Sequence, residues 1–65
     1  MANFNRKEFG ERLRKIRKEK GLTQENLARV IGKTESTIGR FESGVLLPSA
    51  EEIYLLYFFA FLRLV

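Results

Sequence analysis

Two short amphipathic runs meet at a single glycine, Gly32, inside the stretch TQENLARVIGKTESTIGRFESG that covers residues 23–44. Apolar residues recur at helical spacing on both sides of this glycine: Leu27, Ala28 and Ile31 before it, Ile38 and Phe41 after it. Glycine adopts a positive φ without steric cost, and a tight turn between two steeply crossing helices requires such a residue. Helices as short as these do not persist alone in water, so tertiary packing must hold them. The chain is therefore constrained to a bundle of short helices built around this turn.

Capping residues and periodic apolar positions divide the rest of the chain into further helices. Asn5 is the expected N-cap of a first helix, and Gly21 is well placed to end it. The inward stripe of that helix is expected at Phe9, Leu13 and Ile16. The predicted helices cover about residues 6–19, 24–31, 34–43 and 49–65. The sequence thus predicts one all-α domain over residues 1–65, a small four- to five-helix bundle.

The second helix has an expected N-cap at Thr23. A glutamate or glutamine three residues later would complete a capping box, but Asn26 stands at that position. We therefore expect Gln24 and Glu25 to serve the first turn of this helix instead.

The positive charge of the chain is unevenly distributed. The formal net charge is +4, and eight of the twelve lysines and arginines lie within residues 1–20. A basic segment attracts phosphates or an anionic membrane surface, although a charge run by itself is more often a solvated helix face. Charge alone therefore does not decide between phosphates and an anionic membrane surface as the partner.

The residues that are missing exclude several kinds of chemistry. The chain contains no cysteine and no histidine, which excludes disulfides, thiolate zinc sites and histidine acid–base catalysis. No catalytic cluster or phosphate-cradling glycine loop is recognisable, so we expect no enzymatic activity, no cofactor and no metal. The apolar run of residues 53–65 is shorter than the roughly 20 residues of a membrane span. With no secretory signal visible, the sequence predicts a cytoplasmic, nucleoid-associated protein.

The spacing around Gly32 resembles a known family, the phage-repressor or Cro-like helix-turn-helix domains, also called xenobiotic-response-element-type regulators. The residues that carry the resemblance are Leu22-Thr23-Gln24-Glu25, Leu27-Ala28, Ile31-Gly32, Ser36-Thr37-Ile38, Phe41-Glu42-Ser43-Gly44 and Pro48-Ser49. The resemblance implies a helix-turn-helix over about residues 23–43 and a recognition helix at 34–43 that enters the major groove. It implies a transcriptional regulator that binds double-stranded DNA sequence-specifically. A repressor is the regulatory role that we favour.

The resemblance also implies which side chains touch DNA. Base contacts are expected from Glu35, Ser36, Thr37 and Arg40. Arginine can donate two hydrogen bonds to guanine, glutamate can accept from cytosine, and the hydroxyls are less selective. Glutamate in a first turn is equally explained by the helix dipole. Phosphate contacts are expected from Gln24, Thr34 and Ser43.

Arg17 and Glu42 match the family positions of a partly buried ion pair between the first and third helices, which implies a structural role for them. Two residues depart from the family pattern. Lys33 stands where the family often has an apolar residue, and Gly39 lies inside the recognition helix at a cost of about 1 kcal/mol relative to alanine.

The tail is the largest departure, since the chain reads EEIYLLYFFAFLRLV from residue 51. An inward stripe toward the first and third helices is expected at Ile53, Leu56, Tyr57 and Ala60, with Leu64. A helix that is apolar on all faces needs cover that one small domain does not supply. The family binds near-palindromic operators as two-fold dimers, so the resemblance implies a homodimer. Its interface is expected at Leu55, Phe58, Phe59 and Leu62.

Other readings of the tail stay open at this point. It can dock on an anionic membrane surface together with the basic first helix, or fold back on its own domain. It can also be a truncated or redesigned tail. The alternative function is a protein-interaction module, antitoxin-like or an engineered dimer scaffold, in which DNA binding is secondary.

Overall fold

The computed structural model describes residues 5–62, with side chains described for residues 5–59. It contains four helices, which are α1 (Arg6–Glu19), α2 (Gln24–Ile31), α3 (Glu35–Ser43) and α4 (Ala50–Leu62). No strand occurs within this part of the chain. The prediction of an all-α bundle is confirmed. The predicted extension of the last helix to residue 65, and the side chains of Ala60, Leu62 and Leu64, lie outside the described residues.

Local capping explains where the helices begin and end. The Asn5 side chain accepts the N–H groups of Lys7 and Glu8 at the start of α1. The prediction that Asn26 leaves the capping box of α2 incomplete is wrong. Asn26 Oδ1 accepts the N–H of Thr23 at 3.2 Å, and the Asn26 N–H donates to Thr23 Oγ1 at 3.0 Å. The amide oxygen of asparagine thus performs the task that glutamate or glutamine usually performs.

Gly32 and Gly44 end α2 and α3 with φ angles of 69° and 82°. This left-handed conformation is the one that L side chains rarely adopt, so both positions favour glycine. The turn at Gly32 leads directly into Thr34, whose hydroxyl caps α3 by accepting the N–H of Thr37 at 3.3 Å. The two short helices are therefore joined by a tight glycine turn, as the sequence predicted.

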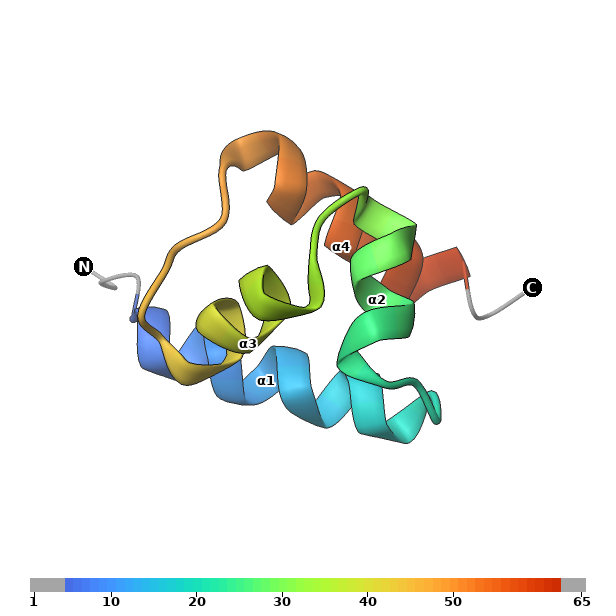
Figure 1. Cartoon of the computed structure of the whole chain (residues 1–65), viewed down its shortest axis with the longest axis horizontal. Coiled ribbons are helices and arrows are strands. Elements are labelled where there is room, and N and C mark those ends of the chain that lie inside the picture. Colours follow the sequence, from blue (N-terminus) through green and yellow to red (C-terminus); the bar gives the residue numbers. More distant parts are fainter. Residues whose placement is uncertain (1–4, 63–65) are drawn as a thin grey trace.

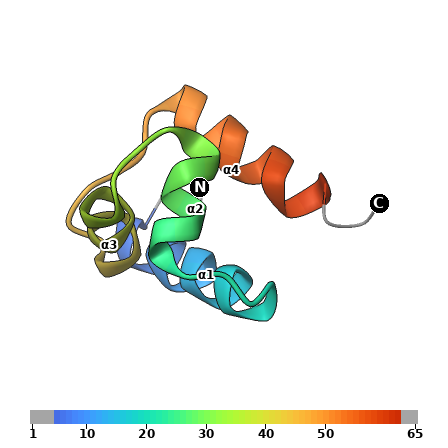
Figure 2. The ribbon, with the colours of Figure 1, turned by 45° about the vertical axis from the view of Figure 1, so that its right-hand side comes forward.

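α2 runs from the end of α1 toward α4, and α3 packs against both α1 and α2 (Figures 1 and 2). The core collects between one and three side chains from each helix: Leu13, Leu27, Ala28, Ile31, Ile38, Phe41 and Leu56. Leu27, Ile38 and Phe41 are fully buried. Burying a large apolar side chain contributes about 1.5–3 kcal/mol, so these three positions hold the bundle together.

α1 and α3 approach closely at Gly10, which is buried in α1. A Cβ atom at this position would lie within 3.0 Å of the carbonyl oxygens of Phe41 and Glu42 in α3. Glycine therefore sets the distance between the two helices, because backbone atoms cannot move aside as a flexible side chain can.

α4 is rotated about its own axis relative to the predicted orientation, so a different set of its side chains faces the core. The side chain of Tyr57 was expected to face inward, but it is 62% exposed. Leu55 and Phe59 are partly buried against the core beside Leu56 instead. The reason is that α4 packs mainly on α2 and not under α1 and α3, which turns a different stripe toward the core.

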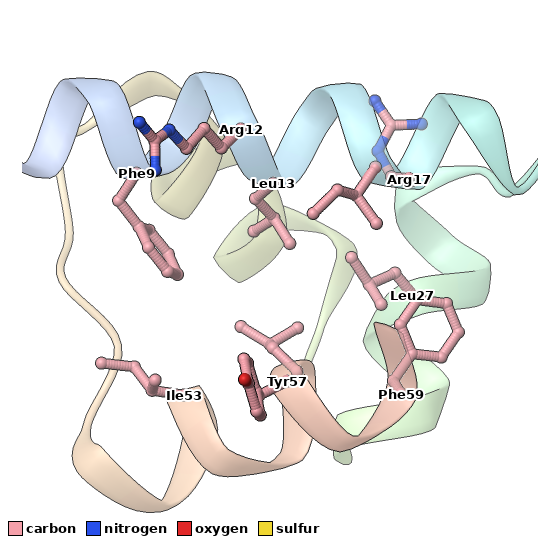
Figure 3. Close-up of a pocket in the computed structure, with 10 residues that line it drawn as sticks. Phe9, Arg12, Leu13, Arg17, Leu27, Ile53, Tyr57 and Phe59 are labelled. Atoms are coloured by element: carbon pink, nitrogen blue, oxygen red, sulfur yellow. The ribbon is translucent and has the colours of Figure 1, made fainter. Parts of the chain in front are cut away.

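An apolar groove remains between α1 and α4, with a volume of about 200 Å³. Figure 3 shows Phe9 and Leu13 of α1 facing Ile53 and Tyr57 of α4 across this groove. None of the described helices is long and apolar enough to cross a membrane.

Lys33, which follows the turn, pairs with α4. Its Nζ lies 2.8 Å from Glu52 Oε2, while Glu52 Oε1 accepts the N–H of Ser49 at 2.8 Å. The hydrogen bond to Lys33 is the main cause that lowers the pKa of Glu52 below its ordinary value, and the Ser49 N–H lowers it further. The charge at Lys33 thus fastens the start of α4 to the turn between α2 and α3.

Replacing Glu52 by glutamine is expected to lower the melting temperature at pH 7 and to flatten its pH dependence. A carboxylate whose pKa is lowered on folding stabilises the fold above its unfolded pKa, and this stabilisation is lost as the pH falls from about 5 through the folded pKa. Thermal melts of both proteins between pH 7 and pH 3 check this. The same fall in stability with acid in both proteins would contradict the prediction.

Candidate nucleic-acid interface

The outward edge of α3 is an exposed polar surface next to the turn. Ile38 and Phe41 anchor the helix in the core with 0% and 1% exposure. The side chains that point outward from the same helix are Glu35, Ser36, Arg40 and Ser43. The helix is therefore held from one side only, and its other long edge is open to a partner.

Two of the predicted contact residues are occupied with capping. The hydroxyls of Thr34 and Thr37 lie 3.0 Å apart, and Thr37 is half-buried. Thr34 also accepts the N–H of Thr37, so this pair organises the first turn of α3. Ser36 and Arg40 are exposed, and no side-chain hydrogen bond or ion pair holds either of them within residues 5–59.

A buried ion pair braces α3 against α1. Arg17 Nε donates to Glu42 Oε2 at 2.6 Å, and Arg17 Nη2 donates to Glu42 Oε1 at 3.1 Å. The two side chains are only 10% and 5% exposed. The hydrogen bond to Glu42 is the main cause that raises the pKa of Arg17 above its ordinary value. A bidentate pair of this kind fixes direction as well as distance.

The same network reaches α2. Arg17 Nη1 donates to the carbonyl of Leu22 at 2.8 Å, and Gln24 Nε2 donates to Glu42 Oε1 at 3.0 Å. The first residue of α2 is therefore tied to the last turn of α3. Arg17, Glu42 and Gln24 together set the angle at which α3 projects.

The hydrogen-bond donors at the end of α3 are used within the chain. Ser43, for which a phosphate contact is predicted, lies among them. The N–H groups of Val45 and Leu46 donate to the carbonyl of Arg40 at 3.0 and 3.2 Å, and the Ser43 hydroxyl donates to the same carbonyl at 3.2 Å. These donors serve the C-cap of α3 in this structure. The loop that follows exposes apolar side chains, with Val45 68% exposed.

A polar hollow of about 280 Å³ opens where α1, α2 and α3 meet. The residues that line it are Arg14, Arg17, Gln24, Gly39, Glu42 and Ser43. Arg14 was not among the predicted site residues. Its spacing of three from Arg17 places both on neighbouring positions of one face of α1, which is the signal that points to it.

Two helices linked by a tight glycine turn, with the second held outward by a brace from a third helix, define the helix-turn-helix class of domain. A family model described as Helix-turn-helix matches residues 13–56, and the chain belongs to this family. The resemblance to Cro-like domains is thereby confirmed.

A curated relative agrees with this assignment. Over 42 residues the chain is 48% identical to YazB of Bacillus subtilis (strain 168), an uncharacterized HTH-type transcriptional regulator. The match covers 65% of this chain and 61% of YazB. No solved structure matched the chain.

Proposed function

We propose that this chain binds double-stranded DNA sequence-specifically and acts as a transcriptional regulator. Among regulatory roles, we favour that of a repressor. The observation that carries the proposal is the open edge of α3, where Ser36 and Arg40 are exposed while Ile38 and Phe41 are buried. The major groove of B-DNA admits a helix, and its base edges present a distinct pattern of donors and acceptors. The name of YazB as a transcriptional regulator supports the same role.

The side chains of α3 divide into base and phosphate contacts. Arg40 can donate to guanine O6 and N7, Ser36 to several bases, and Glu35 can accept from cytosine N4. Thr37 is half-buried and its hydroxyl lies beside that of Thr34, so we expect it to contact DNA only at the edge of α3. Gln24 at the start of α2, Thr34 at the N-cap of α3 and Ser43 at the end of α3 are assigned to phosphates, which position the helix without reading sequence.

We also propose a homodimer on a near-palindromic operator. Tyr54 and Phe58 stack at a centroid distance of 6.4 Å on the outer face of α4, and they are 66% and 53% exposed. Because Leu55 and Phe59 are partly buried against their own core, we assign the central contact of the two-fold interface to Tyr54 and Phe58. Such a dimer places two recognition helices about 34 Å apart on successive major grooves. This function fits a cytoplasmic, nucleoid-associated protein without catalytic activity.

Selection from a random duplex library, read at two salt concentrations, tests this proposal. A symmetric consensus supports a dimeric reader, and a single half-site supports a monomeric one. Affinity should fall steeply with salt because binding releases counterions. Equal affinity for selected and random duplexes would refute sequence-specific binding.

Replacing Arg40 by alanine is expected to weaken discrimination at one base position by about 1–3 kcal/mol. The loss arises because a bidentate donor to guanine disappears while the phosphate contacts stay. Affinities for the consensus and for its single-base variants measure this. The control is Arg29→Ala, which removes the same charge from an exposed ion pair with Glu25 on α2. If both variants lost the same amount of discrimination, Arg40 would contribute through its charge and not by recognising a base.

The second candidate is a protein-interaction module in which DNA binding is secondary. The exposed apolar loop residues Val45, Leu46 and Leu47, together with the outer face of α4, favour it. Sedimentation distinguishes the two, since a stable homodimer supports the DNA reader and a hetero-complex with another protein supports the interaction module.

A further inference from the structure

α4 is anchored to the rest of the domain at few points. Among the α4 side chains that the structure describes, those of residues 50–59, Leu56 alone is buried in the core. Leu55 and Phe59 beside it are only partly buried. One buried side chain fixes the position of a helix better than its direction, since packed helices can cross at a range of angles. Contacts away from Leu56 must therefore set the direction of α4.

The ion pair between Lys33 and Glu52 is such a contact, and it lies at the start of α4. Lys33 Nζ is 2.8 Å from Glu52 Oε2, and the Glu52 side chain is only 16% exposed. Glu52 Oε1 accepts the N–H of Ser49 at 2.8 Å, and Ser49 Oγ accepts the N–H of Glu52 at 3.2 Å. This reciprocal arrangement is a capping box, which holds the carboxylate against the first turn of the helix. Glu52 is therefore fixed relative to α4 before it contacts Lys33.

Lys33 is fixed equally well on the other side of the ion pair. Its N–H donates to the carbonyl of Ala28 in α2 at 2.8 Å, and the next residue, Thr34, is the N-cap of α3. Figures 1 and 2 show the turn between α2 and α3 beside α4. The Lys33–Glu52 pair therefore joins the point where α3 begins to the point where α4 begins.

A second lysine contacts α4 nearer its C-terminal end. Lys20 Nζ, at the C-cap of α1, lies 5.3 Å from the centroid of the Phe59 ring. A cation at this distance over an aromatic face is attracted to the ring. Glu52 and Phe59 are separated by about 10 Å along the helix, with Leu56 between them. Two contacts on opposite sides of the buried anchor define the direction of α4.

We propose that the Lys33–Glu52 pair sets the distance between the two recognition helices of the dimer and thereby determines which spacing of half-sites the protein selects. The inference rests on the proposed DNA-binding function and on the proposed homodimer. The interface assigned to Tyr54 and Phe58 lies on α4, whereas the base contacts are assigned to α3. The path from one recognition helix to the other therefore passes through the angle between α3 and α4 in both protomers. Glu52 acts as a positioning residue and does not itself contact DNA.

The test is binding to duplexes that carry two selected half-sites at different spacings, with a single half-site duplex measured alongside. Fluorescence anisotropy gives the affinities, at a temperature at which circular dichroism shows every variant to be folded. The wild type should prefer one spacing, because one added base pair moves a half-site by about 3.4 Å and turns it around the duplex axis. Glu52→Gln should reduce the preference for that spacing over its neighbours by roughly three- to fivefold, the factor that loss of a partly exposed ion pair supports.

The matched control is Glu51→Gln. It removes the same charge from the adjacent, exposed position of α4, and Glu51 makes no ion pair within residues 5–59. Both variants gain the same net charge, so their general attraction to DNA changes equally. Their affinities for the single half-site should therefore agree, and only Glu52→Gln should have a broader spacing preference. Adding Lys33→Met to Glu52→Gln should broaden it no further, because the pair is already broken.

Equal spacing preferences in Glu52→Gln and Glu51→Gln would overturn the inference and leave the proposed DNA binding standing. A loss of single half-site affinity in Glu52→Gln alone would overturn it too, since the pair would then support α3 itself and not the distance between two copies of α3. Further broadening by Lys33→Met would show that the two residues act separately, against the inference. A wild type that binds half-sites without preferring a spacing would refute the homodimer and the inference together. Absence of binding by the wild type would refute the proposed function.

Discussion

Replacing Arg17 by alanine should reduce the free energy of unfolding by about 3–5 kcal/mol, because the Glu42 carboxylate is left buried without its partner. Glu42 is only 5% exposed, and water cannot replace both hydrogen bonds that the guanidinium donates. The carbonyl of Leu22 loses its donor too. A chain of this size is stable by roughly 3–10 kcal/mol in total. The variant is therefore expected to be largely unfolded near physiological temperature.

Thermal and urea melts followed by circular dichroism measure this effect. The control is Arg29→Ala, whose ion pair with Glu25 has side chains 69% and 63% exposed. Exposed pairs of this kind contribute about 0.3–0.5 kcal/mol, so the control should melt close to the wild type. An Arg17→Ala protein with an unchanged melting temperature would show that the buried pair does not hold α1 and α3 together.

Replacing Gly10 by alanine is the second change for which we expect a large effect, a loss of about 3 kcal/mol or more. The new methyl group would collide with the carbonyl oxygens of Phe41 and Glu42, and both belong to the backbone of α3. Relief requires that α1 and α3 move apart, which stretches the Arg17–Glu42 pair as well. Because the displaced segment is the end of α3, the helix that we propose to read DNA, DNA affinity should fall together with stability.

The same substitution at Gly39 is the matched control, with the opposite sign expected. Alanine there meets ordinary contacts, so stability should rise by about 1 kcal/mol. Urea melts of the two variants in one buffer compare them directly. If Gly10→Ala were as stable as Gly39→Ala, the close approach of α1 and α3 would not depend on glycine.

The fold was largely predictable because its boundaries are set by local interactions. Asn5, Thr23 and Thr34 cap the helices through atoms no more than three residues away. Gly32 and Gly44 end helices through their own φ angles. Interactions of this range can be read from neighbouring letters. Even here the capping hydrogen bond to the Asn26 amide was not predicted. The capping-box motif describes the usual residue types and not every side chain that reaches the same N–H.

Part of the candidate site followed from periodicity. Ile38 and Phe41 define the buried side of α3, so Ser36 and Arg40 had to lie outside. The hydrogen bonds made by the N–H and hydroxyl groups around Ser43 could not be predicted from periodicity. They form because the chain after α3 folds back onto the carbonyl of Arg40.

By itself, the sequence determined a bundle of four to five helices, about where the helices begin and end, and which edge of α3 is exposed. Each of these depends on contacts within a few residues or on a period of 3.6. Only the tertiary structure decided the rotation of α4, the pairing of Lys33 with Glu52 and the polar hollow beside Arg14. These features join residues that are distant in the chain, and helix packing chooses among several apolar stripes that the sequence alone leaves nearly equivalent.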